Sequence, residues 1–105
     1  MFIKVQAENG KVETKQVETH IYFKELFGHK FAIHRHHDVK TDNSKKGIWV
    51  ISHYRTGYKL YSVDSGSKVY LLDKLTGWIE YRFETTENFI NALNENIKDL
   101  ETINN

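Results

Sequence analysis

The chain has 105 residues, 39% of them hydrophobic, which is the size and composition of one domain with a single core. It contains no cysteine, so disulfides, thiolate metal sites and cysteine nucleophiles are excluded. The formal net charge is +1, and the lack of a leader-like or bilayer-length apolar run predicts a cytoplasmic protein without a membrane segment.

The N-terminal third predicts β-structure. Phe2–Ala7 alternates apolar and polar residues, and the Asn9 and Gly10 pair that follows tolerates the positive φ angles of a tight hairpin turn. Residues 12–23 are rich in Val, Thr, Ile, Tyr and Phe, so we expect a second strand within part of this run.

The middle of the chain predicts three further strands. After Gly28, the side chains of residues 30–37 are divided between two faces as in a strand. Residues 38–47 have almost no apolar side chain, so we expect a strand and then an exposed loop. Residues 48–51 are apolar on both faces, and a turn at Arg55, Thr56 and Gly57 leads into residues 58–63. This pattern predicts a hairpin with a central strand.

Residues 68–75 fit either a strand or a short helix that is capped by Ser67 and ended at Gly77. Periodicity does not separate the two, and we favour a strand. Residues 78–83 alternate again, which predicts one more strand.

The C-terminal segment predicts a helix. Thr85 or Thr86 can cap it, and Glu87 suits the positive end of its dipole. Its apolar residues recur at three- and four-residue spacing: Phe89, Ile90, Leu93, Ile97, Leu100 and Ile103. The fold we expect is α+β, a mostly antiparallel five- to six-stranded sheet with this helix packed on one face.

Histidines suggest a metal site. His34 and His36 share one face of the predicted strand, and His53 or Asp38 could complete a site for a divalent metal. The simpler interpretation is a polar, weakly basic sheet face, and we therefore assign no cofactor and no catalytic residue.

Charge is unevenly divided along the chain. Residues 1–62 carry eleven Lys and Arg against six Asp and Glu, a net +5, while residues 63–105 carry four against eight, a net −4. This polarity indicates an anionic partner for the basic part, or two parts that complement each other within the fold or across a homodimer.

A nucleic-acid interface is the alternative that the basic part suggests. Exposed tyrosines can stack on bases while lysine and arginine meet phosphates. Five candidate residues lie around the predicted hairpin and two lie in the loop before it: Tyr54, Arg55, Tyr58, Lys59 and Tyr61, and Lys45 and Lys46. The low net charge of the whole chain favours a protein partner over nucleic acid.

Residues 55–64 together with residues 68–72 resemble the sheet hairpin of RelE/ParE-type ribonuclease toxins. The resemblance implies that Arg55 and Lys59 contact phosphate or take part in catalysis. A RelE-like or metal-dependent nuclease is therefore a further alternative.

Residues 49–57, a Trp-led strand that turns at Thr-Gly, resemble small phage and mobile-element accessory proteins of unknown function. The resemblance implies a regulator or inhibitor that acts by binding. We therefore expect a non-enzymatic binding protein with a protein partner, which uses the sheet face opposite the helix and the loop at residues 38–47.

Overall fold

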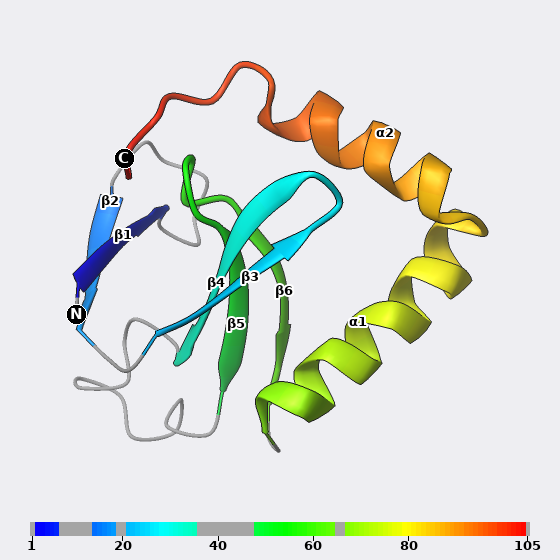
Figure 1. Cartoon of the computed structure of the whole chain (residues 1–105), viewed down its shortest axis with the longest axis horizontal. Coiled ribbons are helices and arrows are strands. Elements are labelled where there is room, and N and C mark those ends of the chain that lie inside the picture. The colour runs from blue at the N-terminus through cyan, green and yellow to red at the C-terminus, as the bar shows by residue number, and fades with distance from the viewer. Residues whose placement is uncertain (1, 7–13, 19–20, 36–47, 65–66, 105) are drawn as a thin grey trace.

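The computed structural model describes residues 2–6, 14–18, 21–35, 48–64 and 67–104. In this part of the chain, strands come first and helices follow (Figure 1). The elements are β1 (Phe2–Gln6), β2 (Thr14–Glu18), β3 (Tyr22–Leu26), β4 (His29–Arg35), β5 (Trp49–His53), β6 (Lys59–Val63), α1 (Lys68–Phe83) and α2 (Thr86–Ile97).

The strands form two separate antiparallel sheets. Among the described residues, strands β3, β4, β5 and β6 are neighbours in chain order, and β1 pairs with β2 in a two-stranded ribbon. The α+β class and the antiparallel pairing are confirmed, but the main sheet has four strands and not five or six. The run at residues 12–23 is divided between β2 and β3, which belong to different sheets.

One face of the four-stranded sheet carries the main core. Phe31 pairs with His53 and Ile33 with Ile51 in the register of β4 and β5, so these side chains point to the same face. The helices cover it (Figure 1). Its buried members are Phe31, Ile33, Ile51, Val63, Leu71, Leu75, Ile79, Phe89, Leu93 and Ile97.

The opposite face is partly covered by the ribbon. Ile3 and Val5 of β1 form a second, smaller core with Ile21 and Ala32, against which Tyr54 packs. Figure 1 shows β1 and β2 on the side of the sheet away from the helices. The face that we expected to be open for a partner is therefore closed where the ribbon lies.

The strands predicted at residues 68–75 and 78–83 are wrong, because both lie within the single helix α1. Ser67 caps this helix, and its Oγ accepts a hydrogen bond of 3.3 Å from the Tyr70 N–H. Gly77 does not end α1, which continues for six more residues. Three buried side chains at every fourth position fit this helix, since a strand would also place the exposed Asp73 on the face of Leu71, Leu75 and Ile79.

The C-terminal helix is confirmed as α2. Thr85 is its N-cap, and the Thr85 Oγ1 accepts a hydrogen bond of 3.1 Å from the Asn88 N–H. Phe89, Leu93 and Ile97 are buried at fourfold spacing against the sheet. In the described part of the chain, neither helix is both long enough and apolar enough to cross a bilayer.

The C-terminal residues return from α2 to the ribbon. The Asn104 Nδ2 donates to the backbone oxygens of Lys4 and Tyr54, both at 2.7 Å, and its Oδ1 accepts from the Lys4 N–H at 3.0 Å. The Arg55 carbonyl accepts from the Ile103 N–H at 2.8 Å. This segment therefore ties β1 to the turn between β5 and β6.

Candidate functional site

The side of α1 that points away from the sheet carries Tyr70 and Tyr81, two of the four exposed large hydrophobic side chains of the described residues. We define the outer face of α1 as the exposed residues Tyr70, Asp73, Lys74, Gly77, Glu80 and Tyr81, with the C-cap residue Glu84 at its end. On a helix of 100° per residue these positions lie within about 60° of Gly77, so they form one continuous stripe.

The core side of α1 fixes the direction of this stripe. Leu71, Leu75 and Ile79 are buried in the main core. At the start of the helix the Lys68 Nζ lies 3.6 Å above the Tyr22 ring, and near its end the Trp78 ring lies 5.1 Å from the Tyr61 ring. Contacts at both ends therefore hold the helix so that the opposite side faces solvent.

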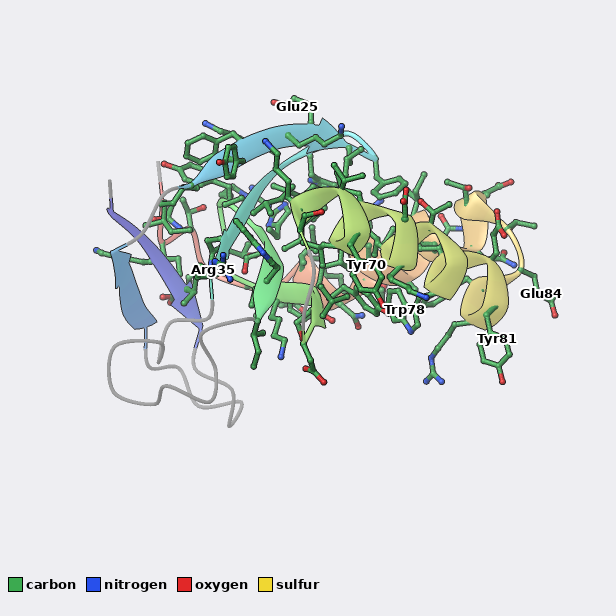
Figure 2. All side chains as sticks on the ribbon, turned by 90° about the horizontal axis from the view of Figure 1, so that it is seen from below. Glu25, Arg35, Tyr70, Trp78, Tyr81 and Glu84 are labelled. Atoms are coloured by element: carbon green, nitrogen blue, oxygen red, sulfur yellow. The ribbon has the colours of Figure 1, made fainter. Side chains whose placement is uncertain are left out.

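Tyr81 is the more exposed of the two tyrosines of the stripe. Its relative exposure is 90%, against 41% for Tyr70 eleven residues earlier. Figure 2 shows Tyr81 at the far end of α1, projecting away from the sheet. A tyrosine in a folded protein usually buries much of its ring, so the exposure of Tyr81 points to a contact with another molecule.

Gly77 lies between the two tyrosines and leaves a low point in the stripe. A Cβ built at this position meets nothing within 4 Å, so packing inside the chain does not require a glycine here. In an exposed helix interior a glycine costs about 1 kcal/mol relative to alanine. The stability of the single chain therefore does not explain why this residue is glycine, whereas close approach by the surface of another molecule does.

A second polar cluster joins α2 to the sheet through two histidines. The Tyr58 N–H donates to the Thr56 Oγ1 at 3.3 Å, and the Thr56 hydroxyl donates to the His53 Nδ1 at 2.8 Å. The His53 Nε2–H donates to the His29 Nδ1 at 3.1 Å, and the His29 Nε2–H donates to the Asn94 Oδ1 at 2.8 Å. Neutral imidazoles satisfy every bond in this chain.

Burial of His53 lowers its pKa to about 4, with smaller contributions from His29 and Arg55. His53 is therefore neutral at pH 7 and can accept the Thr56 hydrogen bond. The buried state of Thr56 and His53 leaves no open position for a substrate at either group. We conclude that this cluster stabilises the docking of α2 and offers no chemistry to solvent except at the half-buried His29.

The predicted metal ligands are not brought together. His34 lies on the face opposite that of His53, because Ala32 pairs with Ser52 and the His34 Nε2 bonds the Ser52 Oγ at 2.9 Å. The His34 Nδ1–H donates to the Arg35 carbonyl at 2.7 Å, so both ring nitrogens are engaged. His36 and Asp38 lie outside the described residues. Within the residues that are described, no three His, Asp or Glu side chains gather as metal ligands.

The predicted nucleic-acid residues divide between the two faces of the sheet. Tyr58 and Tyr61 are half-buried against the helices, where the Asn96 Nδ2 donates to the Tyr58 hydroxyl at 3.4 Å. Tyr54 packs on the ribbon side, with the Lys30 Nζ 4.5 Å above its ring. Arg55 and Lys59 are exposed, while Lys45 and Lys46 lie outside the described residues.

Sequence reasoning missed the outer face of α1. Read as a strand, residues 78–83 place Tyr81 on the same face as Ile79, whereas in the helix the two point apart. The signal that could have found the helix, and with it the exposed stripe, is the fourfold spacing of Leu71, Leu75 and Ile79 together with the polar Asp73, which a strand would place on their face.

The chain matches no family model, no curated protein and no solved structure. The proposals below therefore depend on the geometry of this chain alone.

Proposed function

We propose that the protein is a non-enzymatic binding protein whose partner is a protein and whose contact surface is the outer face of α1. The observation that carries the proposal is the 90% exposure of Tyr81 on a helix that is otherwise well anchored in the core. Exposed tyrosines flanked by charged residues are the type of group that anchors protein interfaces.

The shape of the surface supports a protein partner. Tyr70 and Tyr81 are separated by three helical turns with the open position of Gly77 between them, so a side chain of a partner can enter between two rings. Four of the residues around them are charged, three acidic and one basic, which disfavours the phosphate backbone of a nucleic acid. A regulatory or inhibitory accessory factor would use such a surface.

Affinity capture tests the proposal with two matched exposed aromatics. Tagged wild-type protein, Tyr81→Ser and Phe23→Ser are each used to capture proteins from the cells that express the chain. Phe23 is the control because it is also an exposed aromatic, at 40%, but lies on β3. We expect Tyr81→Ser to reduce capture of a specific protein at least tenfold and Phe23→Ser to leave it unchanged.

A titration with labelled single-stranded and duplex oligonucleotides at low and moderate salt supplies the opposing test. Saturable binding that weakens steeply with salt, together with capture that is indifferent to Tyr81→Ser, would reject the proposal in favour of a nucleic-acid partner.

A further inference from the structure

The outer face of α1 is divided lengthwise into two edges of different chemistry. At 100° per residue, three carboxylates lie about 20 to 60° to one side of Gly77, and two tyrosines lie about 20 to 40° to its other side. We define the acidic edge as Asp73, Glu80 and Glu84, and the aromatic edge as Tyr70 and Tyr81 with Lys74 beside them. Figure 2 shows Tyr81 and Glu84 leaving the far end of α1 in different directions.

The carboxylates of the acidic edge have no cationic partner in the single chain. Among the described residues, no ion pair engages Asp73, Glu80 or Glu84, and none of the three has a lysine or arginine three or four residues away. Glu80 and Glu84 are one turn apart, where like charges repel, and both lie at the negative end of the helix dipole. A cationic group supplied by another molecule would therefore stabilise this end of α1.

The aromatic edge has one ring with a cation and one without. The Lys74 Nζ lies 5.3 Å from the Tyr70 ring, four residues before it in the chain. The corresponding position after Tyr81 is Thr85, and no lysine or arginine of the described residues lies over the Tyr81 ring. The exposed Tyr81 ring therefore offers an open face to a cation from outside.

We infer that the partner of this surface is a basic helix that carries arginines in one row. The inference rests on the proposed function, because it names the chemistry of the partner of the same surface. Arginine suits both edges at once, since its planar guanidinium stacks on a tyrosine ring while its N–H groups bond a carboxylate. Lysine supplies only a compact charge, so we expect it to bind less tightly.

The spacing of the acidic edge favours a helix over an extended segment. Its carboxylates are seven and then four residues apart, which is about 10.5 and 6 Å along the axis. Three arginines at the same two spacings lie within about 40° of one another on a partner helix. In a strand that rises about 3.3 Å per residue, the longer gap corresponds to three residues, which places two of the arginines on opposite faces.

Gly77 gives this contact its closest approach. With no side chain between the two edges, the backbone or an apolar side chain of the partner can lie against α1. A helix of 16 residues is about 24 Å long, so the area buried is below the roughly 800 Å² per partner of a standard interface. We expect a dissociation constant in the micromolar range.

Fluorescence anisotropy of labelled peptides titrated with the full chain tests the inference. The probe is a helical alanine- and glutamine-based peptide of about 18 residues, with three arginines spaced seven and four residues apart and leucines in the row beside them. It is made in both orders of spacing, because a parallel and an antiparallel partner helix need opposite orders. We expect one order to bind with a dissociation constant below about 100 µM at low salt and to bind more weakly as salt is added.

Matched peptides separate recognition from general charge attraction. A peptide of the same composition has its arginines five and four residues apart, which spreads them around the helix, and it should bind at least fivefold more weakly. Replacing the three arginines by lysines at the original spacing should also weaken binding. Replacing them by glutamates should abolish it.

Two conservative variants of the protein test the acidic edge itself. Asp73→Asn and Glu80→Gln each remove one negative charge and should each weaken peptide binding at least threefold. Glu25→Gln, which removes an exposed carboxylate from β3, is the matched control and should have no effect. Glu80→Gln should also raise the midpoint of thermal unfolding by roughly 2 to 4 °C, because the repulsion from Glu84 is removed. Weaker binding by this variant is then not a result of unfolding.

The outcomes separate this inference from the proposed function. No binding of either arginine peptide at about 1 mM protein, equal binding of the peptide with spread arginines, or binding that is insensitive to Asp73→Asn and Glu80→Gln overturns the basic helix as the partner. If a protein captured from cells depends on Tyr81 but not on these carboxylates, the proposed function stands without the inference. If capture and peptide binding are both independent of the outer face of α1, both are wrong.

Discussion

Thr56 connects two parts of the molecule through a single hydroxyl group. It accepts from the backbone of Tyr58 and donates to His53, and it is completely buried. Through Tyr58 this side chain secures the turn between β5 and β6. Through His53 and His29 it is linked to Asn94 of α2.

Thr56→Val is expected to lower the free energy of unfolding by about 2 kcal/mol. Valine keeps the shape of threonine but leaves the buried His53 Nδ1 and the Tyr58 N–H without their partner. Urea unfolding at pH 7 measures the change. Thr76→Val on the exposed side of α1 is the matched control, and we expect its effect to stay within about 0.5 kcal/mol. Equal effects of the two variants would contradict this role for Thr56.

Asn104 has a comparable role near the C-terminus. Asn104→Ala removes three hydrogen bonds to the backbones of Lys4 and Tyr54, and we expect a loss of about 1 to 2 kcal/mol in thermal or urea unfolding. Asn96→Ala removes one long bond of 3.4 Å to the Tyr58 hydroxyl and should cost less than about 0.5 kcal/mol. A smaller effect at Asn104 than at Asn96 would show that the C-terminal segment does not secure β1.

The sequence identifies His53 and Thr56 as residues of interest but not the cluster that they form. Their link depends on His29, which is 24 residues from His53 and reaches it only through the pairing of β4 with β5. Spacing along the chain carries no information on such a contact. The same limit applies to His34 and His53, which share a residue type but lie on opposite faces.

Local patterns predict the elements whose conformation is decided locally. The hairpin of β5 and β6 follows from its Thr-Gly turn, where Gly57 has a φ of 70°, and α2 follows from its apolar spacing and its Thr85 cap. Helix α1 was missed because Val69, Tyr70 and Trp78 are strand-type residues and Gly77 resembles a helix end. Packing of its three buried side chains outweighs these preferences.

Two glycine substitutions test whether each glycine is required by the local backbone conformation. Gly77→Ala should raise the free energy of unfolding by roughly 0.5 to 1 kcal/mol, because the site is helical and a Cβ meets no neighbour. Gly28→Ala should lower it by about 1 kcal/mol, because Gly28 has a φ of 80° in the turn between β3 and β4. Thermal unfolding of both variants measures whether each change raises or lowers the free energy of unfolding. A loss of stability in Gly77→Ala would mean that the glycine serves the fold of the single chain.

At the scale of the whole molecule, two cores on opposite faces of one sheet hold the ribbon and the helices. The sequence indicates α+β structure and antiparallel pairing, but the division of the strands into two sheets depends on which face each apolar residue reaches. Sequence periodicity cannot decide how residues 12–23 are divided, since one strand in a single sheet and two strands in different sheets give the same alternation.

The histidine cluster makes the stability of the whole fold sensitive to acid. The folded pKa of His53 is about 4 and its ordinary value is 6.5, so between these pH values the unfolded chain binds more protons than the folded chain. The free energy of unfolding should therefore be highest above pH 6.5 and fall as the pH decreases toward 4. For His53 alone the loss is on the order of 2 to 3 kcal/mol.

Urea unfolding of wild-type protein and His53→Gln at pH 7.5, 6.5, 5.5 and 4.5 isolates this contribution, because carboxylates and the other histidines titrate in both proteins. We expect His53→Gln to be less stable at pH 7.5, since glutamine cannot reproduce both bonds of the buried imidazole, and the difference between the proteins to shrink as the pH falls. A difference that stays constant from pH 7.5 to 4.5 would mean that His53 is protonated in the folded chain as readily as in the unfolded one. The Thr56 hydroxyl would then have to accept from the His53 Nδ1–H, while the hydrogen bonds from His53 through His29 to Asn94 would keep their direction.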